Sequence, residues 1–177
     1  MSTFNITWVE AVNRANSHPK LSIDDLWQGC VLLARSPQVF TSAISACDIP
    51  SISSDNFTRT VHFGQGPVDR MEQEITLVDR HKVLLPVLIP TTPLTERQFE
   101  CTVPDTGNRV TTTICHGVSE SPEDLYLSFE YSIPYGKVSP EGEEGAKLRA
   151  MYRLKAKDNL VTGLATMRDL KSRGKLA

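Results

Sequence analysis

The 177-residue sequence lacks most features that identify a protein class at once. No apolar run approaches the roughly 20 residues that a membrane-spanning helix needs. The formal net charge of −2 argues against a basic groove for nucleic acid or a polybasic membrane patch. Hydrophobic residues make up 40% and charged residues 23% of the chain, which excludes collagen-like and disordered proteins. We therefore expect a globular protein with no nucleic-acid or membrane partner.

Motifs that carry well-known chemistry are also missing. The chain has no Gly-x-Ser-x-Gly or Walker pattern, and no helix is predicted after Gly64-Gln65-Gly66, so this glycine pair is a turn rather than a dinucleotide site. The four histidines lack the spacing of metal ligands, so we expect no metal.

The four cysteines show no Cys-x-x-Cys spacing, and residues 1–10 lack the basic stretch and apolar core of a secretory signal. Together these two observations predict free thiols in a reducing compartment, the cytoplasm. The cysteines are Cys30, Cys47, Cys101 and Cys115.

The N-terminal part of the chain predicts one strand and then helix. Apolar residues alternate over residues 4–12, which is typical of a strand. Ser22 followed by Asp25 matches a capping box at a helix start, and Pro37 ends that helix and can open a short second turn.

Residues 44–133 instead predict an antiparallel sheet, because turn residues recur without intervening helical stretches. A turn is predicted at Asp79-Arg80-His81, and the strand after it is apolar on both faces. The predicted strands are 57–63, 71–77, 82–89, 98–103, 109–118 and 124–133.

Residues 143–172 contain no proline, and apolar side chains recur every three or four positions, which predicts one long helix. This helix alone is long enough to cover the apolar face of the sheet. We expect residues 1–177 to form a single α+β domain. A curved sheet around one helix leaves a hollow that suits a small ligand, and the alternative is a fully packed core.

Several stretches resemble the fungal AtaL-like branch of the START-like (SRPBCC) helix-grip superfamily. They lie in the same order as in that family and cover most of the chain. The stretches are Leu21-Ser22 with Leu26-Trp27-Gln28-Gly29, Ala34 to Phe40, Ile44 to Cys47, Thr58 to Phe63, Leu125 to Phe129, and Tyr152 with Ala156-Lys157 and Leu164.

The resemblance implies a curved antiparallel sheet of six to seven strands around the C-terminal helix, with one or two short helices after the first strand. It also implies a cavity-bearing cytoplasmic protein of fungal secondary metabolism with a small-molecule substrate and no obligatory cofactor. The chain departs from the family pattern between Pro86 and Asn108, where it carries extra residues and an additional strand-like piece.

Arg59 is the first candidate catalytic residue, because it shares a strand face with Phe57, Val61 and Phe63. A cation on an apolar face needs a partner. One interpretation is an ion pair with an acid such as Glu72 or Glu74, or a side chain that reaches solvent at the rim. The other is a cavity residue that binds an enolate or carboxylate.

His116 and Tyr131 are the other catalytic candidates. His116 is in register with Val110, Thr112 and Ile114, and an imidazole on the inner face could act as general base. Tyr131 ends an apolar row and offers a phenol that can orient a carbonyl. For His116 the alternative is a hydrogen-bonded structural side chain, and for Tyr131 it is a core aromatic residue whose hydroxyl reaches the rim. The expected ligand-binding residues are Phe57, Val61, Phe63, Gln73, Phe129, Tyr152 and Asn159.

Three functions remain open at this point. The first is a cofactor-free enzyme that cyclises, isomerises or rearranges a reactive intermediate by a pericyclic step. The second is a binding or carrier protein for a small molecule or lipid that uses the same cavity without chemistry. The third is an interaction protein, possible as a homodimer, and rests only on the strand that is apolar on both faces.

Overall fold

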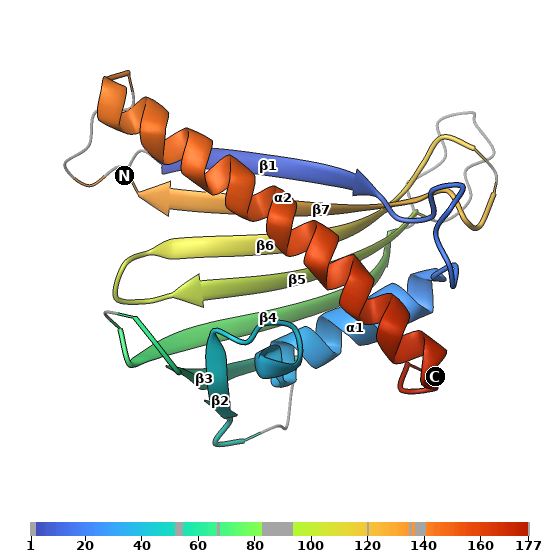
Figure 1. The fold of residues 1–177 in the computed structure, drawn as a ribbon, viewed down its shortest axis with the longest axis horizontal. Helices are drawn as coiled ribbons and strands as arrows, with labels where there is room; N and C mark the ends of the chain where they lie inside the picture. The colour runs from blue at the N-terminus through green and yellow to red at the C-terminus, as the bar shows by residue number, and fades with distance from the viewer. Residues whose placement is uncertain are drawn as a thin grey trace.

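Seven antiparallel strands form one sheet, and a long helix lies across one face of it (Figure 1). The structure is a computed structural model that describes residues 3–51, 55–66, 68–82, 94–119, 121–134, 136 and 141–176. The elements are β1 (Thr3–Ala11), α1 (Ile23–Arg35), the 3-10 helix η1 (Pro37–Val39), β2 (Ile44–Asp48), β3 (Asn56–Phe63), β4 (Arg70–Lys82), β5 (Leu94–Val103), β6 (Asn108–His116), β7 (Leu125–Pro134) and α2 (Glu143–Ser172). This is the predicted helix-grip architecture.

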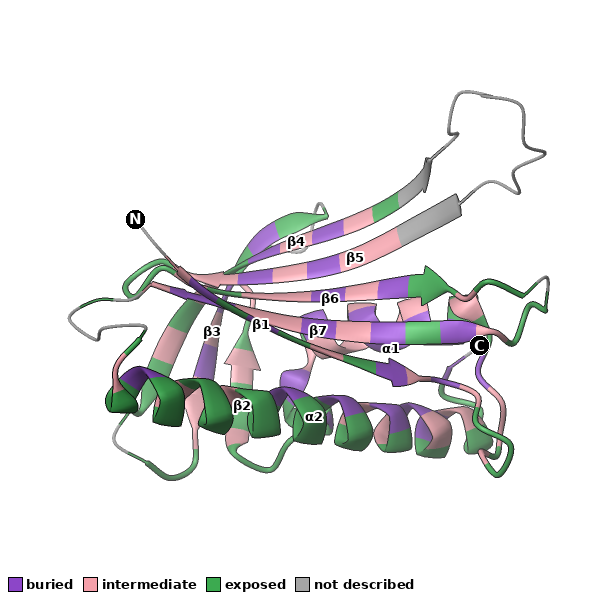
Figure 2. Cartoon of the chain, turned by 90° about the horizontal axis from the view of Figure 1, so that it is seen from above, coloured by how far each residue is buried: buried purple, intermediate pink, exposed green. Residues whose placement is uncertain are grey.

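The strand order is β1-β7-β6-β5-β4-β3-β2, so every pair except β1–β7 joins neighbours in the chain. Helix α2 contacts the sheet mainly at β1 and β7 and then crosses toward α1. Seen from above, the sheet and α2 form two layers, and buried residues line the space between them (Figure 2).

Helix α1 begins and ends where the sequence predicts. Ser22 Oγ accepts a hydrogen bond from the backbone N–H of Asp25, and the Asp25 carboxylate accepts one from the backbone N–H of Ser22. This reciprocal pair satisfies two amide groups that a helix start leaves without partners. Pro37 then opens η1, as its fixed φ angle favours.

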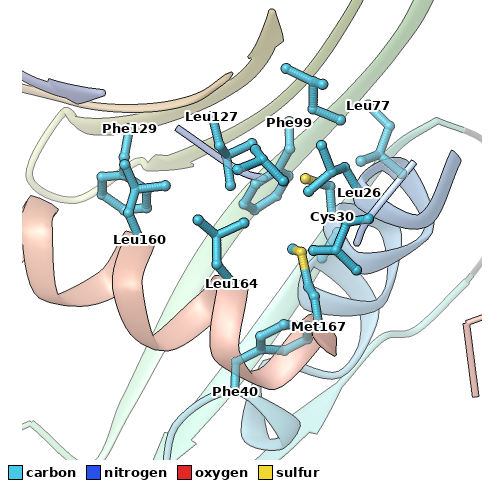
Figure 3. Close-up of a cluster of buried hydrophobic side chains, with 14 of the residues drawn as sticks. Leu26, Cys30, Phe40, Leu77, Phe99, Leu127, Phe129, Leu160, Leu164 and Met167 are labelled. Carbon is cyan, nitrogen blue, oxygen red and sulfur yellow. The ribbon is translucent and has the colours of Figure 1, made fainter. Parts of the chain in front are cut away.

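The core lies between the inner face of the sheet and both helices. Figure 3 shows side chains of α2, α1 and the sheet pointing toward one another. They include Leu160, Leu164 and Met167 of α2, Leu26 and Cys30 of α1, and Leu77, Phe99, Leu127 and Phe129 of the sheet. All nine are at most 8% exposed, so their burial supplies most of the driving force that holds α2 on the sheet.

A polar contact also joins the two helices. Lys171 Nζ near the end of α2 lies 2.6 Å from Oδ2 of Asp25 in the first turn of α1, and it donates a second hydrogen bond to the backbone oxygen of Lys20. Asp25 is only 9% exposed. The pair therefore fixes the end of α2 beside the start of α1.

Strand β4 differs from the sequence prediction at its C-terminal end. The predicted turn at Asp79-Arg80-His81 is wrong, because β4 continues through these residues to Lys82. Asp79 is accommodated in the strand by Arg97, its cross-strand partner on β5, whose Nε lies 2.9 Å from Oδ1 of Asp79. Beyond Lys82, the predicted strand 82–89 falls outside the described residues. The additional strand-like piece before Asn108 is β5.

The contact between Asp25 and Lys171 makes stability depend on pH. Burial alone would raise the pKa of Asp25, but the hydrogen bonds from Lys171 and Ser22 outweigh it and hold that pKa below its ordinary value of 3.8. A lowered carboxyl pKa contributes stability that is present above the ordinary value and is lost as pH falls through the folded-state value. We expect the free energy of unfolding to drop below about pH 4, measured by urea denaturation at several pH values.

In the variant Asp25→Asn the free energy of unfolding should be lower than in wild type by about 1–2 kcal/mol at pH 7, and it should decline less as the pH falls below 4. Asp169→Asn is the matched control, because Asp169 pairs with Arg173 at the exposed end of α2 and should change stability by less than about 0.5 kcal/mol. Parallel acid profiles for wild type and Asp25→Asn would contradict the assignment.

Candidate functional site

A cavity of about 240 Å³ lies between the sheet, α2 and the segment that contains η1. Its walls are mostly apolar, and polar side chains enter it at a few separate points. The lining residues are Cys30, Leu33, Pro37, Phe40, Thr41, Ile44, Arg59, Gln73, Phe99, Cys101, Val110, Thr112, Leu127, Phe129, Tyr131, Asn159, Leu160, Gly163 and Met167. Apolar walls with a few convergent polar groups are typical of small-ligand sites.

Arg59 lies on β3 with its side chain turned inward, and the residue is 5% exposed. Its Nε donates to Oε1 of Gln73 at 2.7 Å, and Gln73 is its direct cross-strand partner on β4. Its Nη1 donates to the backbone oxygens of Leu33 at 2.8 Å and Ala34 at 2.5 Å. These two oxygens belong to the last turn of α1, where carbonyl groups have no donor within the helix.

The predicted ion pair of Arg59 with Glu72 or Glu74 is wrong. The register pairs Glu72 with Thr60 and Glu74 with Thr58, so both acids lie on the opposite face of the sheet from Arg59. The partner is instead the C-terminal end of α1, where the helix dipole places partial negative charge. Burial lowers the pKa of Arg59, and the guanidinium nevertheless stays protonated because its ordinary pKa is above 12.

Tyr131 lies on β7 at the other side of the cavity. Nδ2 of Asn159 on α2 donates a hydrogen bond of 2.9 Å to the phenolic oxygen, which leaves the phenol's own proton available to donate. The rings of Phe129 and Tyr152 pack edge-on against Tyr131 at 5.1 and 4.9 Å between centroids. Burial, together with Tyr152, raises the pKa of Tyr131 to about 12. Tyr131 is therefore a neutral hydrogen-bond donor near pH 7.

Thr112 on β6 is a cavity residue that the sequence did not single out. It is 3% exposed, and its Oγ1 has no hydrogen-bond partner among the described residues. The signal was present, because Thr112 shares a strand face with the apolar residues Val110 and Ile114. A threonine on such a row is usually satisfied by a backbone carbonyl, and no property of the sequence shows that this one is not.

Two cysteines also line the cavity, Cys30 on α1 and Cys101 on β5. Burial raises the pKa of Cys30 to about 12 and also raises the pKa of Cys101, which lies beside Arg59. Both remain neutral thiols near pH 7, and a nucleophilic cysteine needs the thiolate. They act here as small apolar wall residues.

His116 is exposed and is not among the residues that line the cavity. It shares the strand face of Thr112 and Ile114, but it is the last residue of β6, where the strand has passed the end of the cavity and the side chain is exposed. Strand parity gives the direction of a side chain and does not show how far along the strand the cavity extends.

The expected ligand-binding residues divide into two groups. Gln73, Phe129 and Asn159 line the cavity. The other four do not line it: Phe57 and Val61 are buried in the sheet, Phe63 is half-buried near its edge, and Tyr152 packs behind Tyr131.

Among the residues that the structure describes, no cluster of three or more His, Cys, Asp and Glu side chains could hold a metal ion. No helix among them is both long and apolar enough to cross a membrane.

Comparison with known proteins identifies a family and a fold. The family model described as acetylaranotin biosynthesis cluster protein L (AtaL) matches residues 6–174. No curated protein matches the chain. The Zhui aromatase/cyclase from Streptomyces sp. R1128 is 11% identical, with 97% of this chain and 95% of that chain covered and a TM-score of 0.52. Ara h 8.0201 is 8% identical, with 94% and 97% covered and a TM-score of 0.51. At these identities the two structures show a shared fold alone.

The environment of Tyr131 predicts an unusual titration. Spectrophotometric titration should show one of the four tyrosines ionising near pH 12, and this step should vanish in Tyr131→Phe. A raised folded-state pKa contributes stability below pH 10 that is lost as pH rises toward about 12, so the free energy of unfolding of the wild type should fall in that range. Tyr126→Phe is the control, because Tyr126 lies on the exposed outer face of β7. A high-pH step that survives in Tyr131→Phe would overturn the assignment.

Proposed function

The chain belongs to the AtaL family, and from this premise we propose that it binds a hydrophobic or polyketide-like small molecule in its cavity and carries out a cofactor-free step of fungal secondary-metabolite biosynthesis. The step is a cyclisation, an isomerisation or a pericyclic reaction. The observation that carries the proposal is the cavity itself, in which Arg59 and the Tyr131–Asn159 pair enter otherwise apolar walls from two sides.

The described residues supply three contributions to such a step. The apolar walls select one folded conformer of a flexible substrate, and a well-oriented intramolecular reaction gains a large effective molarity. The Tyr131 phenol can donate a hydrogen bond to a carbonyl oxygen at one side of the cavity, and Arg59 can bind an oxyanion that the substrate already carries at the other side. One fixed donor at a developing oxyanion is worth roughly a factor of 100 to 1,000 in rate.

A non-catalytic binding or carrier protein is the second candidate, and a specific observation favours it. Among the described residues that line the cavity none is a histidine or a carboxylate, so this part of the wall offers no general base that titrates near pH 7. Any reaction here would depend on the shape of the cavity and on fixed donors. A substrate that already carries a reactive enol or diene would need nothing more.

The experiment that separates the two candidates uses the unstable intermediate made by the biosynthetic cluster that contains the gene. Wild type and Tyr131→Phe are each incubated with this compound, and product ratios are followed by liquid chromatography with mass detection. Catalysis requires a faster reaction or an altered ratio with wild type and a reduced effect with the variant. Binding without any change in rate or ratio would support the carrier.

Gly163 allows a direct test that the cavity is the binding site. It lies on α2 at the cavity wall, and an added Cβ would have no atom within 4 Å. Gly163→Phe should fill the cavity and weaken binding of the neutral dye N-phenyl-1-naphthylamine by at least about tenfold, because its ring occupies the ligand's space.

Gly163→Ala is the matched control at the same position. It should keep the wild-type affinity for the dye and raise the free energy of unfolding by up to about 1 kcal/mol, because alanine is the better helix former. Fluorescence titration and thermal unfolding measure the two quantities. Unchanged dye binding in Gly163→Phe would exclude this cavity as the binding site.

A further inference from the structure

We propose that the ligand of this cavity is an acid with two separated oxygen functions: an oxyanion, as a carboxylate or enolate, that binds Arg59, and a hydroxyl or carbonyl oxygen that binds Thr112. The inference rests on the proposed function, since it assumes that the cavity binds a small molecule. It adds the chemical class of that molecule and assigns Thr112 as a ligand-binding residue.

The first argument is the charge at Arg59. Its hydrogen bonds from Nε and Nη1 go to an amide oxygen and two backbone oxygens, all of them uncharged acceptors. None of the ion pairs found among the described residues includes Arg59. The end of α1 offers only about half a negative charge. A buried guanidinium therefore keeps a net positive charge at the cavity wall, where the neutral thiol of Cys101 lies beside it.

The second argument is the hydroxyl of Thr112. Its cross-strand neighbours are Phe99 on β5 and Phe129 on β7, so the groups on both sides of it are aromatic rings. A hydroxyl that is removed from water and left without a partner is destabilising. The same hydroxyl at the wall of an otherwise apolar cavity is a ready partner for a ligand oxygen.

The third argument is the separation of the two groups. Arg59 is on β3 and Thr112 is on β6, three strands away across the sheet. Three strand spacings of about 4.8 Å and a register offset of four residues at about 3.3 Å each place their backbones roughly 20 Å apart along the sheet, and the long arginine side chain shortens the gap between the polar atoms. The cavity wall between them includes Phe99 and Cys101 of β5. This arrangement fits a flat apolar body with an oxygen function at each end.

A fully apolar occupant, such as a hydrocarbon chain, fits less well. It would exclude water from the cavity, leave the charge of Arg59 uncompensated and leave Oγ1 of Thr112 without a partner. Burial of a charged or polar group without a partner is costly. A neutral ligand with one oxygen would satisfy Thr112 and leave the charge of Arg59 uncompensated.

Three naphthalene probes separate the two contacts: 6-hydroxy-2-naphthoate carries both functions, 2-naphthoate lacks the hydroxyl, and 6-hydroxy-2-naphthamide lacks the charge. Their dissociation constants are measured by calorimetry at pH 7. Wild type should bind 6-hydroxy-2-naphthoate at least about tenfold more tightly than the amide, because a charge-assisted hydrogen bond is the stronger one. It should bind 2-naphthoate about threefold to tenfold more weakly than the hydroxy acid.

Two variants assign these preferences to residues. Thr112→Val, which keeps the shape of the side chain, should remove the preference for the hydroxyl and leave the affinity for 2-naphthoate unchanged. It should fold at least as stably as wild type, since it deletes an unpaired buried hydroxyl. Arg59→Gln should reduce the carboxylate-to-amide preference to about one, and Arg59→Lys should retain part of it because the charge remains.

The outcomes separate two claims: that the ligand is an acid, and that the cavity binds a small molecule at all. If the probes bind wild type with equal affinity and Gly163→Phe blocks all three, the cavity binds ligands and the assignment of an acid is overturned. If none of the probes binds wild type at millimolar concentration, the proposed binding function is wrong and the inference falls with it. If Arg59→Gln does not fold, the affinities of Arg59→Lys for 6-hydroxy-2-naphthoate and 6-hydroxy-2-naphthamide are compared instead. A preference for the carboxylate equal to that of wild type would overturn the role of Arg59.

Discussion

The structure depends on the contact between the Arg59 guanidinium and the carbonyl end of α1. This contact joins β3 to the last turn of the helix and satisfies carbonyl groups that the helix itself leaves open. It also places a positive charge at the cavity wall, and no carboxylate of the described residues forms an ion pair with it. An ion pair with a buried acid would have neutralised that charge, whereas a helix end compensates only part of it. One interaction thus supports the fold and keeps a charge available for a ligand.

The cavity depends on two features of α2: large side chains pack the helix against the core, and a glycine between them leaves space at the cavity wall. Leu160, Leu164 and Met167 anchor the helix in the core, and Lys171 fixes its end to α1. Gly163 lies between these anchors and adds no side chain to the space beneath it. Close packing at the anchors and an open wall at the glycine therefore come from the same helix.

Most of the fold could be predicted from the sequence, because its signals are local. The Ser22–Asp25 capping box, Pro37 and the alternation on β3, β4 and β7 each depend on neighbouring residues. The site was harder to predict, because it depends on contacts between distant segments. The alternation of side chains along β3 predicted that Arg59 points inward, but it gave no sign that α1 ends beside this residue. The same parity suggested His116, which shares a row with Thr112 but lies beyond the cavity.

The pairing of β1 with β7 has a consequence for how the molecule folds. Thr7 Oγ1 on β1 donates to Oε2 of Glu130 on β7, and the two residues are separated by 123 positions in the chain. Contacts this distant in sequence carry a large loop-closure entropy, and proteins rich in them fold slowly. Tyr131 lies on the strand that completes this pairing, so its side of the cavity is among the last parts expected to form. A ligand that binds there would act on the folded protein and slow its unfolding rather than guide the early steps of folding.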